Sequence, residues 1–348
     1  MRRLTLLLAE DVASQRRRTG HPQALPYRLD HLSRLGWDVE SADPYAAARS
    51  GRSRSRLARA LSRLGPPAGP TLTQASRLVR GSDVLAVFES EGHFLALLRA
   101  LIPPMRRGRH VIVVCWLSEL LPQMSPARRR LLRFAYRGVD AVVCFSPNQV
   151  PVLTGGLGVR ADQVHPVPFG IDTGEFPVSA REEPYLLAVG RDRGRDWGAT
   201  FAAVRDCPLP LKVLCRPDEL TGTDVPPGVE VLGYVSRETY RELLAGATAV
   251  LLLTRELAYP TGQTVLLEAM SNGKVCVVTD TPAMHDYLDA AATIGVPVGD
   301  VGAARAALDR VLGDPQLRRQ MGVAAAQVAR ERYDATVMCG YLDRVLRG

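Results

Sequence analysis

Short apolar runs recur along the whole chain and alternate with longer polar segments whose apolar residues are spaced as in helices. The run at residues 247–254 has the length and flanking residues of a strand buried on both faces of a parallel sheet. The runs predicted as strands are residues 4–9, 37–42, 83–88, 110–115, 141–145 and 164–168, then 185–189, 211–215, 229–233, 250–254 and 274–279. This alternation predicts an α/β architecture of doubly wound, largely parallel sheets.

The alternation stops and restarts around residues 172–184, a stretch rich in proline, glycine and acidic residues. Such composition is typical of a linker between domains. The chain therefore divides into two similar Rossmann-like domains. In sheets of this kind ligands bind beyond the carboxyl ends of the strands, so a cleft between the domains is the expected binding site.

Composition indicates a globular protein of 348 residues with 46% hydrophobic residues. No apolar run reaches the roughly 18 residues that a membrane-spanning helix needs. The start of the chain is interpreted as a first strand, because acidic residues follow at once and no small-residue cleavage site is present. A cytoplasmic location is therefore expected. The six cysteines form no C-x-x-C pair and the histidines are scattered, which favours free thiols and no metal site.

The net charge of +8 comes almost entirely from arginine, since Lys212 and Lys274 are the only lysines. Arginines cluster in residues 49–63, 106–109 and 128–137, and the last cluster predicts a basic amphipathic helix. It could contact an anionic membrane surface or a phosphorylated ligand, or simply be a solvated helix face. Nucleic-acid binding is not expected, because the arginines lack interleaved aromatic residues.

Residues 259–273 are the most informative stretch, because a strand, a glycine turn, a helix and a strand follow one another there. A turn at Gly262 that opens a helix leaves the N–H groups of Gln263, Thr264 and Val265 unpaired at the positive end of the helix dipole. Such a terminus suits a phosphate or diphosphate, and Glu268 could accept hydrogen bonds from sugar hydroxyls. The alternative is an ordinary strand–helix turn of an α/β domain.

Several motifs in order make the pattern specific. They are Ser146-Pro-Asn, Val167-Pro-Phe-Gly-Ile-Asp172, Ala188-Val-Gly-Arg191, Gly233-Tyr-Val and Gly262-Gln-Thr-Val-Leu-Leu-Glu268-Ala-Met. In this order and spacing they resemble the GT-B glycosyltransferases, most closely the retaining glycosyltransferase family 4. The resemblance covers the chain well from about residue 141 onward and the first 140 residues only loosely.

The resemblance implies an acceptor-binding domain over residues 1–172 and a donor-binding domain over residues 183–330, with a last helix at about 331–348 crossing back onto the first. It also implies a nucleoside-diphosphate sugar as donor, transfer in the cleft with retention at the anomeric carbon, and no metal or other cofactor. The acceptor could be a natural product, a saccharide or a lipid-linked saccharide at the inner face of a membrane.

The resemblance also assigns donor-binding residues. Arg191 would neutralise the donor diphosphate, because a guanidinium binds phosphate oxygens in a bidentate manner. Glu268 would hold the ribose hydroxyls, and Tyr234 would line the nucleobase. The full predicted donor set is Arg191, Arg195, Arg216, Tyr234, Gly262, Gln263, Thr264, Val265 and Glu268.

Three positions depart from the family pattern. The family's first glutamate would stand eight residues before Glu268, where this chain has Pro260, and Glu256 is the nearest carboxylate that could replace it. The family's second phosphate cation, a lysine, corresponds to Asp196, so that Arg195 or Arg193 would have to supply the charge. The third departure is Phe169, which replaces an asparagine.

On the acceptor side, polar residues that follow the strands of the first domain are the candidates. They are Glu10, Asp11, Gly20, His21, Glu91, His93 and Glu119. Glu119 and His93 are the preferred catalytic candidates, together with Glu256 from the second domain. Two other readings stay open. One is a sugar-nucleotide epimerase of the GT-B type, and the other is a catalytically silent binding protein, which Pro260 and Asp196 would suit.

Overall fold

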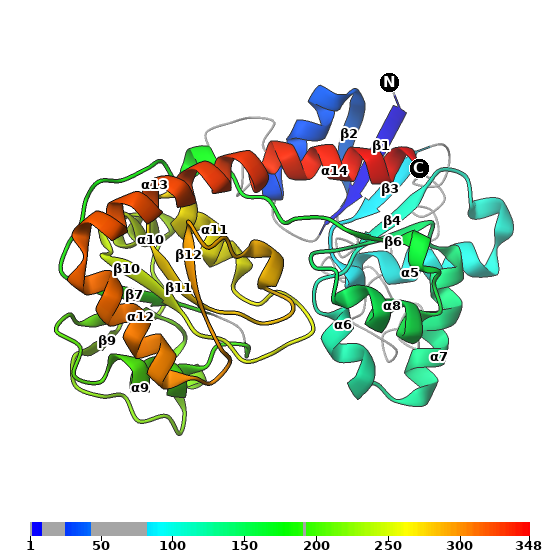
Figure 1. Cartoon of the computed structure of the whole chain (residues 1–348). Coiled ribbons are helices and arrows are strands. Elements are labelled where there is room, and N and C mark those ends of the chain that lie inside the picture. Colours follow the sequence, from blue (N-terminus) through cyan, green and yellow to red (C-terminus); the bar gives the residue numbers. More distant parts are fainter. Residues whose placement is uncertain (1, 9–24, 43–81, 191–192) are drawn as a thin grey trace. The chain divides into compact units, whose positions relative to one another are not determined.

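The computed structural model describes residues 2–8, 25–42, 82–190 and 193–348. The chain divides into two compact units, drawn in Figure 1. Unit 1 comprises Met1–Pro168 and Met338–Gly348, and unit 2 comprises Phe169–Val337.

The described part of unit 1 contains a six-stranded parallel sheet in the order β2-β1-β3-β4-β5-β6. Its strands are β1 (Arg2–Leu7), β2 (Trp37–Ala42), β3 (Asp83–Ala86), β4 (His110–Val113), β5 (Ala141–Cys144) and β6 (Val164–Pro166). Every residue of β3, β4 and β5 is buried. The contiguous apolar runs of the sequence therefore mark central strands covered on both faces, as predicted.

Helices pack against this sheet through a core that includes Leu95, Ile112, Leu132, Val142 and Leu153. Among its described residues, the α-helices that pack there are α5 (Glu89–Leu101), α6 (Leu117–Leu120), α7 (Pro126–Ala135) and α8 (Gln149–Leu157). The predicted basic amphipathic helix is α7, which begins at an N-cap: Ser125 accepts a hydrogen bond from the Arg128 backbone N–H.

The helical spacing of apolar residues predicts a regular helix from about residue 23 to residue 35, ended by Gly36, and the structure differs from this prediction. Residues Pro26–Leu35 form the 3-10 helix η1, in which Tyr27 and Arg28 adopt left-handed backbone conformations with φ of 56° and 55°. Left-handed backbone is unfavourable for residues with a Cβ atom. These two residues therefore interrupt the helix, and Gly36, at φ 93°, ends it.

Unit 2 repeats the architecture with a second six-stranded parallel sheet, in the order β12-β11-β10-β7-β8-β9. Its strands are β7 (Leu186–Val189), β8 (Leu211–Leu214), β9 (Val229–Val231), β10 (Ala249–Leu252), β11 (Cys276–Thr279) and β12 (Thr293–Val296). The edge strand β12 was not predicted, because its short Thr-Ile-Gly-Val sequence gives little strand signal. Strand β10 is central and leads into the stretch that contains Gly262.

The helices of unit 2 bury their apolar sides against the sheet. They are α9 (Trp197–Val204), α10 (Arg237–Gly246), α11 (Gln263–Ser271), α12 (Val301–Gly313) and α13 (Pro315–Arg332). Trp197 and Phe201 of α9 share one core cluster with Leu308 and Val311 of α12. Asp196, Ser236, Asp300 and Asp314 each cap a helix by accepting a backbone N–H bond.

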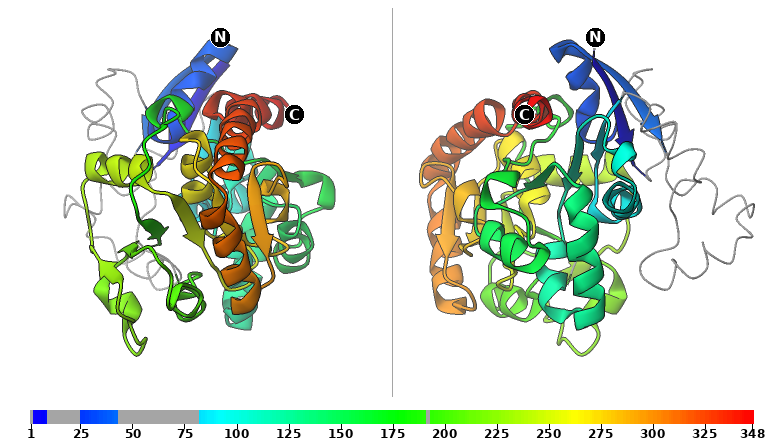
Figure 2. Two further views of the ribbon diagram at one scale, coloured as in Figure 1. Left: turned by 60° about the vertical axis from the view of Figure 1, so that its left-hand side comes forward. Right: turned by 90° about the vertical axis from the view of Figure 1, so that its right-hand side faces the viewer.

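The C-terminal helix α14 (Ala335–Arg347) begins in unit 2 and continues in unit 1. Within unit 1, the Trp37 indole N–H donates a hydrogen bond of 2.6 Å to Asp343 of α14. The Arg347 guanidinium donates to the Leu35 carbonyl at 2.7 Å. Figures 1 and 2 show this red end of the helix beside the blue strands β1 and β2.

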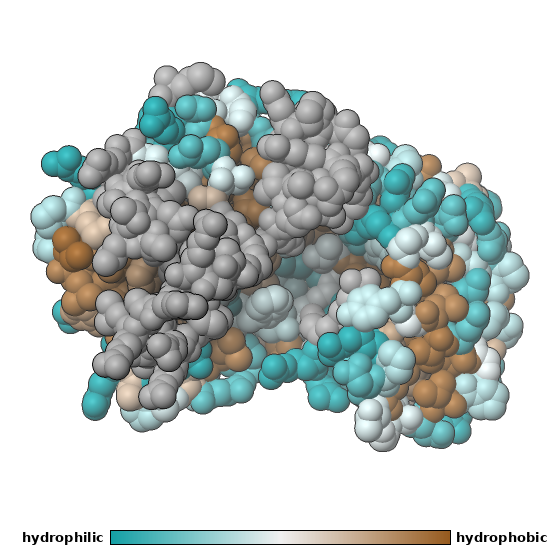
Figure 3. Space-filling view, turned by 180° about the vertical axis from the view of Figure 1, so that it is seen from behind, coloured by the Kyte–Doolittle hydropathy of each residue, from teal (hydrophilic) through white to brown (hydrophobic). Residues whose placement is uncertain are grey.

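Hydrophilic and apolar areas alternate over the coloured surface that Figure 3 draws. Among the described residues, large apolar side chains are exposed on both units, and the most exposed are Val323, Tyr234 and Leu101. None of the described helices combines the length and hydrophobicity that crossing a membrane requires. All six cysteines are free thiols.

Candidate functional site

The amino-terminal end of α11 is built around Gly262, which has a left-handed backbone conformation with φ 89°. The chain turns there from β10 into the helix. Among the described residues, the N–H groups of Thr264 and Val265 have no hydrogen-bond acceptor, and Thr264 is exposed. Gln263 points inward and is buried. The helix therefore presents the positive end of its dipole and two donors without an acceptor, as an anion site requires.

Arg195 lies directly beside this helix end. Its Nε donates to the Val189 carbonyl at 2.8 Å, and its Nη1 donates to the Thr261 hydroxyl at 3.1 Å. The side chain is buried and passes over Gly190, where a Cβ atom would come within 2.3 Å of Arg195 Cγ. Arg195, Gly190 and Gly262 are thus brought together, so that a fixed positive charge adjoins the helix end with its two unbonded amides.

Glu268 lies on the same helix and is buried. Arg237 Nη1 lies 3.0 Å from its Oε1, and the Tyr240 hydroxyl donates to its Oε2 at 2.5 Å. Burial raises the pKa of Glu268, whereas the charge of Arg237 and these hydrogen bonds lower it, and the net direction is upward. The Tyr240 pKa is raised by burial and by the Glu268 charge.

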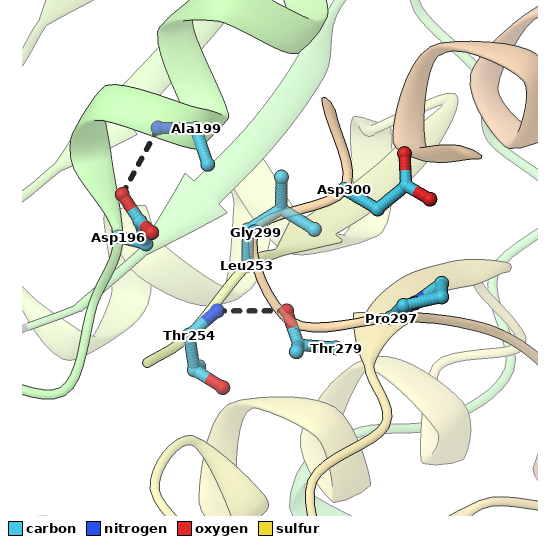
Figure 4. A pocket seen from close by; sticks show the side chains of 8 residues that line it. All are labelled: Asp196, Ala199, Leu253, Thr254, Thr279, Pro297, Gly299 and Asp300. Carbon is cyan, nitrogen blue, oxygen red and sulfur yellow. Dashed lines mark hydrogen bonds between the residues drawn. The ribbon is translucent and has the colours of Figure 1, made fainter. Parts of the chain in front are cut away.

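Asp196, which occupies the position of the family's lysine, has a structural role in unit 2. Its carboxylate accepts a hydrogen bond of 3.0 Å from the Ala199 N–H and so caps α9. Figure 4 shows it beside a pocket at the carboxyl ends of β10, β11 and β12. Across that pocket, Asp300 caps α12 in the same way. The negative charge of Asp196 is therefore balanced by the amino end of a helix.

The other predicted donor residues lie nearby in the sequence but are not all brought together. Arg216 is paired with Glu219, its Nε donating to a carboxylate oxygen at 3.0 Å. Tyr234 is exposed after β9, and Glu256 is exposed in the loop after β10. Arg191 lies outside the described residues, as do Glu10, Asp11, Gly20 and His21.

On the unit 1 side, the described glutamates at the start of α5 bind backbone groups. Glu91 accepts a hydrogen bond of 3.1 Å from the Phe88 N–H and so satisfies a backbone donor at the start of the helix. Glu89, which was not predicted, accepts from the Cys115 and Trp116 N–H groups at 3.0 Å each. Burial raises the Glu89 pKa. This carboxylate fixes the loop after β4.

The two preferred acceptor-side residues lie in different surroundings. His93 packs edge-to-face on Tyr136 and its Nε2 lies 3.2 Å from the Tyr136 hydroxyl. Burial, with a smaller contribution from the Arg128 charge, lowers the His93 pKa to about 4. This geometry favours a packing role. Glu119 is half-buried in α6, and Gln123 Nε2 donates to its backbone carbonyl at 3.1 Å.

The loop after β4 also presents an aromatic surface. Trp116 is 48% exposed and stacks on Phe88 with 5.9 Å between ring centres. The Tyr27 ring meets the Phe88 ring edge-on. Trp116 lies at the carboxyl end of a central strand, where ligands of α/β sheets bind.

Sequence reasoning missed Arg237, Tyr240, Glu89 and Trp116. Arg237 and Tyr240 stand three residues apart at the start of α10 and therefore share one helix face. That spacing is the sequence signal that could have paired these two residues. It does not show that they contact Glu268, because this contact depends on how α10 packs beside α11.

Two family models match complementary parts of the chain. Residues 29–175 match the model described as Glycosyltransferase Family 4. Residues 219–328, which contain α10 and α11, match the model described as Glycosyl transferases group 1. No curated protein is similar enough in sequence to match.

Solved structures resemble the whole chain at low identity. HepE of Anabaena, in complex with UDP and glucose, is 15% identical with a TM-score of 0.69, and the match covers 100% of both chains. Sucrose-phosphate synthase from Thermosynechococcus elongatus is 15% identical with a TM-score of 0.73, covering 100% of this chain and 98% of that chain. The N-terminal domain of trehalose-6-phosphate phosphatase from Candida albicans is 15% identical, with a TM-score of 0.67.

These likenesses establish a GT-B fold with two Rossmann-like units, as predicted. Together with the two family models, they identify the chain as a glycosyltransferase.

Proposed function

We propose that the chain transfers a sugar from a nucleoside-diphosphate sugar to an acceptor hydroxyl, with retention at the anomeric carbon and without a bound metal. The acceptor would be a natural product, a saccharide or a lipid-linked saccharide. One observation carries the donor assignment: the buried Arg195 guanidinium adjoins the unbonded amides at the amino end of α11. The complexes of HepE with UDP-glucose support a nucleotide-sugar donor by analogy.

The chemistry explains why such a site suits this donor. When the bond from the anomeric carbon to the diphosphate breaks, negative charge grows on the leaving diphosphate. Donors fixed in place before the reaction stabilise that charge without reorganising. Arg195 and the N–H groups of Thr264 and Val265 would do so, with Arg191 as a further cation. The acceptor oxygen would form the new bond, and a diphosphate oxygen would take its proton.

On the acceptor side, Glu119 remains the proposed polar contact, since His93 faces Tyr136. The aromatic surface of Trp116 and Phe88 offers an apolar face for a ring of the acceptor. The exposed arginines of α7, Arg128, Arg130 and Arg133, would contact an anionic membrane surface or a phosphorylated acceptor.

The first test is a thermal-shift screen against UDP, GDP, dTDP and ADP and their common sugars. A selective rise in Tm with one nucleotide is expected, and Arg191→Ala and Glu268→Ala should abolish it. Arg160→Ala is the matched control, because Arg160 is exposed and paired with Asp162. No shift with any nucleotide in a folded sample would contradict the donor assignment.

Conversion of a donor sugar without any acceptor would favour the epimerase, and nucleotide binding with no turnover would favour the silent binding protein.

A further inference from the structure

Glu268 belongs to a cluster of five residues from three segments of unit 2. We call Glu175, Phe176, Arg237, Tyr240 and Glu268 the Arg237 cluster. Figure 1 shows the two helices that contribute most of it, α10 and α11, close together. The hydrogen bond from Tyr240 of α10 to Glu268 of α11 joins them directly.

Arg237 is held by three other members of the cluster besides Glu268. Its Nε and Nη2 donate to the two carboxylate oxygens of Glu175, at 2.9 and 3.1 Å. Its guanidinium carbon lies 4.8 Å from the centre of the Phe176 ring and 5.6 Å from that of Tyr240. A bidentate pair combined with two aromatic contacts leaves the guanidinium little freedom to rotate. Its remaining Nη1 therefore points at Glu268 from a defined position.

The cluster leaves Glu268 able to bind more. Each oxygen of its carboxylate accepts one hydrogen bond inside the cluster, from Arg237 and from Tyr240. An ionised carboxylate has about four lone-pair sites, so roughly two stay available. Both sites can accept hydrogen bonds from hydroxyl groups only while the carboxylate is ionised, because protonation turns one acceptor site into an O–H donor.

Charge balance shows why Arg237 is needed for that state. Glu268 is buried, and burial favours its neutral form. Arg237 supplies the positive charge in contact with it, and Glu175 holds that charge in place. Burial lowers the Arg237 pKa, but the hydrogen bonds to Glu175 and the charge of Glu268 raise it by more. The net pKa is therefore raised and the guanidinium stays charged.

We propose that Arg237 is a positioning residue for donor recognition: it holds the Glu268 carboxylate ionised and oriented so that this carboxylate accepts hydrogen bonds from the ribose hydroxyls. The inference rests on the proposed function, in which Glu268 binds the ribose. It adds that the ability to distinguish ribose from deoxyribose depends on a residue that does not itself touch the sugar. Glu175 contributes indirectly, by orienting Arg237.

The experiment compares nucleotides that differ by one hydroxyl. Calorimetry would give the Kd of UDP, GDP and ADP and of their 2′-deoxy counterparts for the wild type, Arg237→Lys and Arg237→Met. The wild type should favour the ribonucleotide of its preferred base by about tenfold, as expected for a hydrogen bond to a charged group. In Arg237→Met this ratio should fall to about one, and in Arg237→Lys to an intermediate value.

Control variants separate positioning from folding. Arg241→Met removes an exposed arginine from the same helix and should leave the ratio unchanged. Glu175→Gln keeps Arg237 but weakens its fixation, so the ratio should fall partway. A general structural defect would weaken ribose and deoxyribose nucleotides equally and leave their ratio intact.

The outcomes separate this inference from the proposed function. A wild type that prefers ribonucleotides, with the same preference in folded Arg237→Met or Arg237→Lys, would overturn the role of Arg237 alone. A wild type that binds both nucleotide series equally would remove the ribose role of Glu268, and Arg237 would have nothing to position. Loss of discrimination in both Arg237 variants, with Arg241→Met unaffected, would establish the proposal.

Discussion

The Arg195 guanidinium lies against Gly262, and the two residues depend on each other. A Cβ atom at position 262 would stand 3.1 Å from Arg195 Nη1 and 3.0 Å from Leu252 Cδ2. These separations are too short for an added methyl group unless its neighbours move. Gly262 therefore allows both the left-handed turn into α11 and the close approach of a positive charge to the helix end.

Replacing Gly262 by alanine should weaken both folding and donor binding. The left-handed backbone is expected to cost about 1–2 kcal/mol for a residue with a Cβ atom. Displacement of Arg195 should weaken nucleotide binding by about tenfold or more. Chemical denaturation and calorimetric titration with the nucleotide identified by the thermal-shift screen measure the two effects.

Gly313→Ala is the matched control for that substitution. A Cβ atom at Gly313, the last residue of α12, would meet nothing within 4 Å. This variant should keep the wild-type affinity for nucleotide. If Gly262→Ala bound nucleotide as tightly as Gly313→Ala, the amino end of α11 would not be the diphosphate site.

Asp196→Ala should lower stability without affecting the nucleotide. Loss of the N-cap bond to the Ala199 N–H should reduce the free energy of unfolding by about 1 kcal/mol. The Kd for nucleotide should stay within about twofold, because Arg195 supplies the nearby charge. Both quantities can be measured on one sample. A large gain in affinity would mean instead that the Asp196 carboxylate repels the bound diphosphate.

The fold could be predicted from the sequence because its strands are central and parallel. A strand such as β4 or β10 is buried along its whole length, so it reads as a contiguous apolar run. The edge strand β12 lacks that signal. The helix η1 was predicted as regular, since its left-handed residues Tyr27 and Arg28 are not types that mark such a backbone.

For the candidate site, local features were predictable and packing partners were not. Gly262 and the helix it begins follow from a glycine between a strand and a helical pattern. The pairing of Arg237 with Glu268 depends on how α10 and α11 lie together, which no spacing in the sequence encodes. The cap formed by Asp196 could have been read locally, because an aspartate preceding a helix is a common start signal.

Arg99 should be the most sensitive arginine of the described part of unit 1. It is buried, and its guanidinium donates to the carbonyls of Gly138, Met105 and Gly108 and to the Asp140 carboxylate. Arg99→Met would leave these acceptors without their donor and should cost about 3–5 kcal/mol in unfolding free energy. The exposed Arg107→Met should change it by less than about 0.5 kcal/mol. Equal stability of the two variants in urea denaturation would contradict this structural role.

Acid should destabilise unit 1 through its buried histidines. Burial, assisted by the charge of Arg99, lowers the pKa of His110 to about 3, well below its ordinary value of 6.5. Between these pH values the unfolded chain binds a proton that the folded chain does not, so the free energy of unfolding rises with pH. The stabilisation is complete above pH 6.5 and is lost as the pH falls toward 3. At pH 5 the loss from His110 alone should be roughly 2 kcal/mol, at about 1.4 kcal/mol per pH unit.

His110→Leu identifies this contribution, because leucine fills a buried strand position without taking up a proton. Urea denaturation at pH 7 and pH 5 should show a smaller loss of stability in the variant than in the wild type, by about the same 2 kcal/mol. His93, whose pKa is lowered to about 4, should maintain part of the acid sensitivity in that variant. His285→Leu is the control, since His285 is exposed and its contact with Asp280 raises its pKa. Acid sensitivity that is identical in His110→Leu and wild type would show that His110 takes up its proton without unfolding.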